Sequence, residues 1–135
     1  MEGPADIVER IRREVRSGTA IPKPRSTEPH VVKGWGTRRG ESALIYLVPN
    51  RRDPSRPYEK GVNETEWRLA WERLKGTGVF SRAWFRKSMP ACNSEGGCNF
   101  TAIGGVFQLL GEARHQHGEY LSKAITRVES EASRR

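Results

Sequence analysis

Two cysteines and two nearby histidines are the residues of this chain best suited to binding a metal ion. Cys92 and Cys98 precede His115 and His117, and thiolate sulfur and imidazole nitrogen are ligands that zinc prefers. Structural zinc sites usually leave about two to four residues between the cysteines and about three to five between the histidines. Here five residues separate the cysteines and one separates the histidines. We therefore expect two free thiols and no metal or other cofactor, with a zinc site or a local disulfide as the alternatives.

Side chains suited to catalysis do not form a recognisable pattern. A cysteine nucleophile needs a neighbouring base, and the sequence does not bring His115 next to either thiol. A metal-dependent nuclease needs clustered carboxylates, whereas Glu66 is explained by helix capping, three positions after Asn63. Residues 99–105 could present backbone amides to a phosphate at a helix start, but they lack nucleotide-binding spacing. We expect no catalytic residues, and a small nuclease or nucleotide-handling enzyme remains an alternative.

Positive charge is the strongest chemical feature of the chain. Lysine and arginine number 24 against 16 aspartate and glutamate residues, which gives a formal net charge of +8. Such a surface attracts polyanions, because neutralising phosphates releases condensed counterions. The expected function is therefore non-catalytic binding of nucleic acid, with DNA favoured over RNA. A small interaction or inhibitor protein that docks its basic face on an acidic protein surface is the second hypothesis.

Cationic and aromatic side chains occur in two groups that could contact nucleic acid. Arginine pairs with phosphate through two parallel hydrogen bonds, and tryptophan can stack on an unpaired base. The candidates in the first group are Lys33, Trp35, Arg38, Arg39, Arg51, Arg52 and Arg56. The candidates in the second group are Arg82, Arg86 and Lys87. The hypothesis requires these groups to converge on one surface, and the alternative for Trp35 is a place between sheet and helices.

Hydrophobic patterning in the N-terminal half predicts one helix and a β-hairpin. Apolar residues recur at helical spacing over 6–17. Prolines over 19–30 predict an extended connector. Strands are expected over 30–36 and 42–48, because these segments are rich in β-forming residues, and a turn over 37–40 joins them.

The C-terminal half predicts three helices. The first covers 64–75, with a capping box that starts at Asn63. Ser81 is expected to cap the second helix, and Pro90 to end it. A loop then leads to a third helix that begins at Asn99 or Thr101. The core residues expected to join these elements are Trp67, Trp71, Leu74, Trp84, Phe85, Ile103, Phe107 and Leu110.

The order of elements from 63 to 120 resembles that of winged helix-turn-helix DNA-binding domains. In that family the helix before the wing enters the major groove and the wing contacts the DNA backbone. The resemblance implies that Asn99, Thr101 and Gln108 face base edges. It also implies that Arg114 lies on the wing, in the glycine-containing segment that follows the third helix.

A central core helix is the alternative for the third helix. Residues 101–112 contain no lysine or arginine. Gly104 and Gly105 lie within this stretch, and each interior glycine costs a helix roughly 1 kcal/mol relative to alanine. Close approach of another element would compensate for that cost.

The expected architecture is a single α+β domain over residues 1–135. It consists of an N-terminal helix, a small antiparallel β-hairpin or sheet and a C-terminal three-helix cluster of winged-helix type, with a disordered tail over 130–135. The sequence has no apolar run of the roughly 20 residues that cross a bilayer and no signal-peptide pattern at its start. We expect no membrane partner and a cytoplasmic protein. A homodimer is expected by analogy with DNA readers that bind two half-sites.

Overall fold

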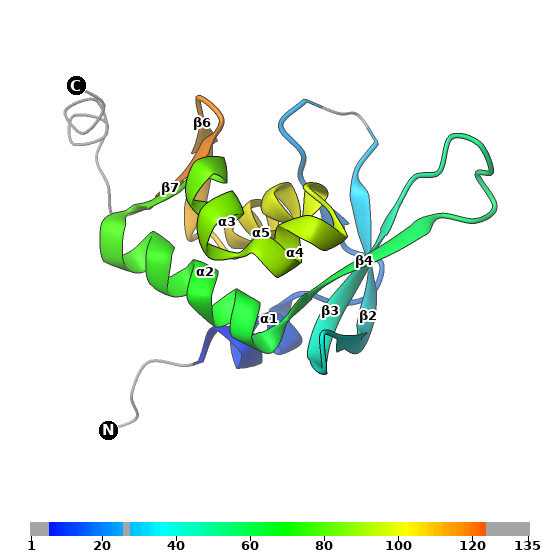
Figure 1. The fold of residues 1–135 in the computed structure, drawn as a ribbon, viewed down its shortest axis with the longest axis horizontal. Coiled ribbons are helices and arrows are strands. Elements are labelled where there is room, and N and C mark those ends of the chain that lie inside the picture. Colours follow the sequence, from blue (N-terminus) through cyan, green and yellow to red (C-terminus); the bar gives the residue numbers. More distant parts are fainter. Residues whose placement is uncertain (1–5, 26–27, 124–135) are drawn as a thin grey trace.

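A computed structural model of the chain describes residues 6–25 and 28–123 and has a mixed α+β architecture (Figure 1). The expected tail over 130–135 lies outside the described residues. The elements in chain order are α1 (Ile7–Glu14), β1 (Ala20–Ile21), β2 (His30–Arg38), β3 (Glu41–Val48), β4 (Tyr58–Asn63), α2 (Glu64–Thr77), β5 (Val79–Phe80), α3 (Arg82–Ser88), α4 (Pro90–Glu95), α5 (Cys98–Leu109), β6 (Ala113–Gln116) and β7 (Glu119–Ser122). The α3, α4 and α5 helices lie between two antiparallel sheets (Figure 1).

The first sheet has the strand order β1-β2-β3-β4 and contains the expected hairpin. Arg38 pairs with Glu41, so a two-residue turn joins β2 to β3. The turn residues Arg39 and Gly40 have φ angles of 53° and 80°. Positive φ at both positions is the requirement of the tight turn whose twist matches that of the flanking strands. The hairpin prediction is confirmed, and β2 extends two residues beyond the expected strand.

The flanks of this sheet differ from the sequence expectation. Within the segment 19–30, expected to be an unpaired connector, Ala20–Ile21 pairs with the start of β2. The unexpected strand β4 pairs with β3 along its whole length, although Lys60 and Gly61 have low β-propensity. Long-range pairing with the hairpin stabilises both segments and is invisible to local patterning. The helix expected over 6–17 ends at Glu14, because Val15 adopts an extended conformation.

The second sheet has the order β5-β7-β6 and includes a hairpin where the wing segment was expected. A two-residue turn joins β6 to β7, because Gln116 pairs with Glu119. His117 and Gly118 form this turn, with φ angles of 51° and 78°. The short strand β5 pairs with β7 and thereby connects the end of α2 to the hairpin.

The helix-capping predictions are confirmed for α2 and α3. Asn63 and Glu66 form the reciprocal capping box of α2, and the Ser81 side chain accepts from the Trp84 amide at the start of α3. The segment after Pro90 was wrongly expected to be a loop. It forms α4, with the proline in the first turn, where no intrahelical N–H is required. Up to Lys123, where the described part of the chain ends, the C-terminal half therefore contains four helices instead of three.

The start of α5 also differs from the prediction. The helix begins at Cys98 after Gly97, and neither expected capping residue precedes it. The Asn99 side chain is buried in other contacts, and the Thr101 hydroxyl donates to the carbonyl of Cys98 at 3.1 Å.

The helix α5 runs through the core, as the alternative interpretation predicted. An aromatic cluster surrounds it, in which Phe80 contacts Phe85, Phe100, Phe107 and Tyr120. Among the expected core residues, Trp71 and Trp84 are only partly buried and pack against the core. The remaining expected core residues are buried: Trp67, Leu74, Phe85, Ile103, Phe107 and Leu110. Within residues 6–25 and 28–123, no helix combines the length and apolarity needed to cross a membrane.

The two glycines of α5 permit contacts that any larger residue would prevent. A Cβ at Gly104 would overlap the Tyr120 ring. A Cβ at Gly105 would lie 2.5 Å from the Ile21 Cγ2 atom and 2.7 Å from the Pro22 carbonyl oxygen. Each glycine therefore lets a neighbouring segment reach the helix backbone: β7 at Gly104 and the chain after β1 at Gly105.

Replacing Gly104 with alanine is expected to reduce the free energy of unfolding by about 3 kcal/mol, because the new methyl group overlaps a fully buried ring. Urea unfolding measures this change. Gly76→Ala in α2 is the matched control, since a Cβ there meets nothing within 4 Å. The control should gain up to about 1 kcal/mol from helix propensity. Equal effects of the two substitutions would contradict the close approach of Tyr120.

His30 gives the fold a defined pH dependence. This residue is 1% exposed and stacks on Tyr46 with ring centroids 5.1 Å apart. Burial, with a smaller contribution from Lys23, lowers the pKa of His30 from 6.5 to about 4. Between these values the unfolded chain binds a proton that the folded chain does not, so stability falls as the pH drops through this window.

His30 should make the free energy of unfolding of the wild type about 2 kcal/mol smaller at pH 5 than at pH 7.5. A His30→Phe variant should lack this contribution. Phenylalanine preserves a ring against Tyr46 and removes the titrating group. The control is His117→Asn in the exposed β6–β7 turn, because asparagine tolerates positive φ. An unaltered pH dependence in His30→Phe would exclude His30 as the group responsible.

Candidate anion-binding site

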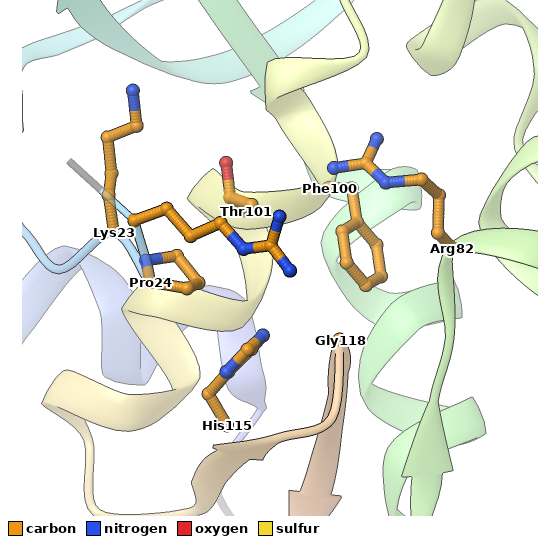
Figure 2. Close-up of a pocket in the computed structure, with 8 residues that line it drawn as sticks. Lys23, Pro24, Arg82, Phe100, Thr101, His115 and Gly118 are labelled. Atoms are coloured by element: carbon orange, nitrogen blue, oxygen red, sulfur yellow. The ribbon is translucent and has the colours of Figure 1, made fainter.

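A cavity of about 410 Å³ lies beside the first half of α5, where three other segments meet it. These segments are the chain that follows β1, the start of α3 and the β6–β7 hairpin (Figure 2). The lining residues are Lys23, Pro24, Arg25, Arg82, Phe100, Thr101, His115 and Gly118. Three of these side chains are cationic and none is acidic, so the cavity, defined here as the cationic cavity, is suited to an anion.

The chain after β1 supplies Lys23 and Arg25. Pairing of Ala20–Ile21 with β2 fixes the start of this segment, and close approach to Gly105 fixes Pro22 against α5. The next residues therefore emerge at the cavity. Lys23 and Arg25 form no ion pair with the described residues, so neither charge is neutralised in that part of the chain.

Arg82 supplies the third cation from the opposite side of the cavity (Figure 2). Its Nη1 atom donates to the Gly97 carbonyl at 3.0 Å, and its guanidinium carbon lies 4.6 Å from the centroid of the Phe100 ring. Burial lowers the pKa of Arg82, and the charge of Arg86 lowers it further. Arg82 is therefore a partly desolvated cation with a cationic neighbour, and an anion in the cavity would relieve both penalties.

His115 and Thr101 add polar groups without charge. The His115 ring lies edge-on to Tyr120, with centroids 5.1 Å apart. Burial and the neighbouring Arg25 lower the pKa of His115 below 6.5, so the imidazole is mainly neutral at pH 7. Thr101 also lines the cavity, and its hydroxyl donates to the Cys98 carbonyl. The neutral His115 ring can donate one hydrogen bond to a phosphate oxygen, and the Thr101 oxygen can accept one from a sugar hydroxyl.

The structure brings two of the candidate residues, Arg82 and Thr101, into the cationic cavity. Arg86 and Lys87 lie exposed on the same helix as Arg82 and make no ion pair with described residues. Sequence reasoning missed Lys23 as a site residue, together with Arg25. The available signal was two cations alternating with prolines at 22–25, in a segment interpreted only as a connector.

Arg38 and Arg39 form ion pairs with glutamates and lie outside the cavity. Arg39 donates to both carboxylate oxygens of Glu66 at 2.6 and 2.7 Å and to Glu95 at 2.6 Å. Arg38 donates to the other oxygen of Glu95 at 3.0 Å. The Glu66 carboxylate, followed by Glu95, raises the pKa of Arg39 above its ordinary value. These two arginines are therefore neutralised locally and join the hairpin to the helices.

Asn99 is fully buried and cannot reach a base edge in this structure. Its Oδ1 atom accepts from the Tyr46 hydroxyl at 2.6 Å, and its Nδ2 atom donates to the Cys92 carbonyl at 2.9 Å. Gln108 is partly exposed on α5 and lies outside the cavity lining. Because most of α5 is covered by the core, the helix does not present a continuous polar face.

The other candidates are distributed over the first sheet and the hairpin. Lys33 pairs with Glu59 at 2.7 Å, and Arg56 lies 3.8 Å from Asp53. Trp35 is covered by the Arg12 guanidinium, 3.8 Å from its ring centroid. Arg51 and Arg52 lie exposed in the β3–β4 loop, and Arg114 is partly buried on β6. The candidate residues therefore do not form one surface.

The two cysteines are free thiols. Burial, with a smaller contribution from Glu66, raises the pKa of Cys92, so this residue remains protonated at neutral pH. A protonated thiol is a poor nucleophile and metal ligand. The Tyr46 hydroxyl contacts the Cys98 Sγ atom at 3.3 Å. In the described part of the chain, no three His, Cys, Asp or Glu side chains converge in a way that could hold a metal ion.

Comparison with protein-family models, curated proteins and solved structures finds no match for this chain. The functional assignment therefore depends on the chemistry of the cationic cavity and its surroundings.

Arg39→Ala is expected to lower the free energy of unfolding by about 3 kcal/mol, because it leaves Glu66 and Glu95 without their main cationic partner. Their side chains are only 11% and 18% exposed. Lys33→Ala also removes one cation of an ion pair, but this pair is exposed and the variant should change stability little. Urea unfolding of the two variants distinguishes these outcomes. A small loss in Arg39→Ala would contradict a structural role for the buried ion pairs.

Proposed function

We propose that this protein binds nucleic acid without catalysis, through phosphate contacts centred on the cationic cavity. The observation that carries the proposal is the convergence of Lys23, Arg25 and Arg82 on one cavity that has no acidic lining residue. Elsewhere on the described surface, acidic neighbours neutralise several arginines, including Arg38 and Arg39. The unpaired charge at the cavity is thus suited to an external anion.

The proposed surface continues from the cavity along α3. Arg86 lies one helical turn after Arg82, and its charge is close enough to lower the pKa of Arg82. Lys87 adds a further exposed cation. Such an extended row of cations can neutralise several phosphates, which distinguishes a nucleic-acid strand from a single small anion.

The order of α2, β5, α3, α4, α5 and the β6–β7 hairpin supports the proposed likeness to winged helix-turn-helix domains only in part, because α4 is an additional helix between α3 and α5. The burial of α5 changes what that likeness implies for binding. This helix has too few exposed polar groups to read bases in a groove. We propose instead that α3 and the cavity contact the phosphate backbone, so that binding depends weakly on base sequence. DNA is the first nucleic acid to test.

The Arg86→Ala, Lys87→Ala double variant should bind a labelled DNA oligonucleotide about tenfold more weakly than the wild type near 0.1 M salt. The slope of log affinity against log salt should fall by about 2, because two phosphate contacts are lost. Fluorescence anisotropy across a salt series measures both quantities. Both side chains are exposed, so the fold should be unchanged by circular dichroism.

The matched control is Arg13→Ala with Arg16→Ala, which removes the same charge from the region of α1. These two exposed residues do not line the cavity. An equal loss in both double variants would show that net charge alone drives binding. If the folded wild type fails to bind DNA or RNA even at low ionic strength, the proposal is wrong and an acidic protein becomes the partner to seek.

A further inference from the structure

We infer that the cationic cavity accepts the terminal phosphate of a single strand in preference to an internal phosphodiester. This inference rests on the proposed function and specifies which part of the nucleic acid enters the cavity. It follows from the shape of the cavity, its charge and the kinds of hydrogen-bond donors that line it.

The shape of the site favours a chain end. The cavity of about 410 Å³ is a half-open hollow bordered by the segment at 23–25, α3, α5 and the β6–β7 turn. Its volume falls in the lower part of the range for small-ligand pockets, about 300–1,000 Å³. A duplex is far too wide to enter a pocket of this size. A phosphate and its attached sugar at the end of a flexible strand can enter, while the rest of the strand continues over the α3 cations.

The charge of the site favours a monoester over a diester. An internal phosphodiester carries one negative charge, whereas a phosphate monoester carries about −1.5 to −2 near pH 7 and has three terminal oxygens. Lys23, Arg25 and Arg82 supply three positive charges at the same cavity. The monoester therefore gains more electrostatic energy than the diester in this partly desolvated site.

The hydrogen-bond donors of the cavity also fit the three terminal oxygens of a phosphate monoester better than the two free oxygens of a phosphodiester. The two guanidinium groups can each donate a pair of parallel hydrogen bonds, and the Lys23 ammonium donates from a third position. Thr101 and His115 provide neutral polar groups in the same lining. Figure 2 shows Lys23 and Arg82 on opposite sides of the cavity, with His115 on a third side, so a ligand there can be contacted from several directions.

The test compares single-stranded DNA oligonucleotides of one sequence that carry a 5′-phosphate, a 3′-phosphate or only hydroxyl ends, each with a dye at the end not being tested. Fluorescence anisotropy with the full chain should show about tenfold tighter binding for at least one phosphorylated end. In the Lys23→Ala, Arg25→Ala double variant this ratio should fall to about 1, while the hydroxyl-ended strand still binds. The Arg13→Ala, Arg16→Ala control should retain the wild-type ratio.

The possible failures identify which proposal is wrong. If the wild type binds all three strands equally and with salt dependence, nucleic-acid binding stands and the end preference is overturned. A phosphate-dependent ratio that persists in the cavity variant would also overturn the inference, because the end would bind elsewhere. If no strand binds but deoxynucleoside 5′-monophosphate does, both proposals fail and the cavity is a small-molecule site.

Discussion

The ion pairs of Arg39 join the first sheet to the helical part of the protein. The residue occupies the tight β2–β3 turn, and its guanidinium reaches Glu66 in α2, Glu95 in α4 and the Gly61 carbonyl of β4. Glu66 simultaneously caps α2 through the backbone amide of Asn63. One side chain therefore fixes the hairpin, the edge strand and two helices relative to one another. Because the carboxylates are largely shielded from water, their charges need this partner for the arrangement to persist.

The adjacent glycines of α5 fix the positions of two segments that border the cavity. Gly104 admits Tyr120, which holds β7 against the helix and supports the His115 ring. Gly105 admits Pro22, after which the chain presents Lys23 to the cavity. Neighbouring positions on a helix point in different directions, so Tyr120 and Pro22 contact α5 at different places. The same pair of glycines thus serves core packing and fixes two of the segments that border the candidate site.

Local sequence signals predicted the parts of the fold that depend on local interactions. The Asn63 capping box, the Ser81 cap and the hairpin turn involve neighbours in the chain, and each is present, although the turn expected over 37–40 consists of Arg39 and Gly40 alone. The strands β1 and β4 were missed because their stability comes from pairing with distant residues. The candidate site was predicted only in part for the same reason. The sequence identified Arg82 as a basic residue on a short helix, but no local pattern brings Lys23 beside it.

Arg39 and Arg82 differ in their surroundings, and this difference is the reason that we propose a structural role for Arg39 and anion binding for Arg82. Acidic partners raise the pKa of Arg39, so its burial is compensated within the fold. Burial and the like charge of Arg86 lower the pKa of Arg82, so burying this charge has a cost, and the Gly97 carbonyl and the Phe100 ring contact the guanidinium in place of a carboxylate. Moving Arg82 into water would relieve this cost, whereas an anion in the cavity would turn it into binding energy. Lys23 and Arg25 face the same cavity without acidic partners among the described residues, which extends this reasoning from one arginine to the site as a whole.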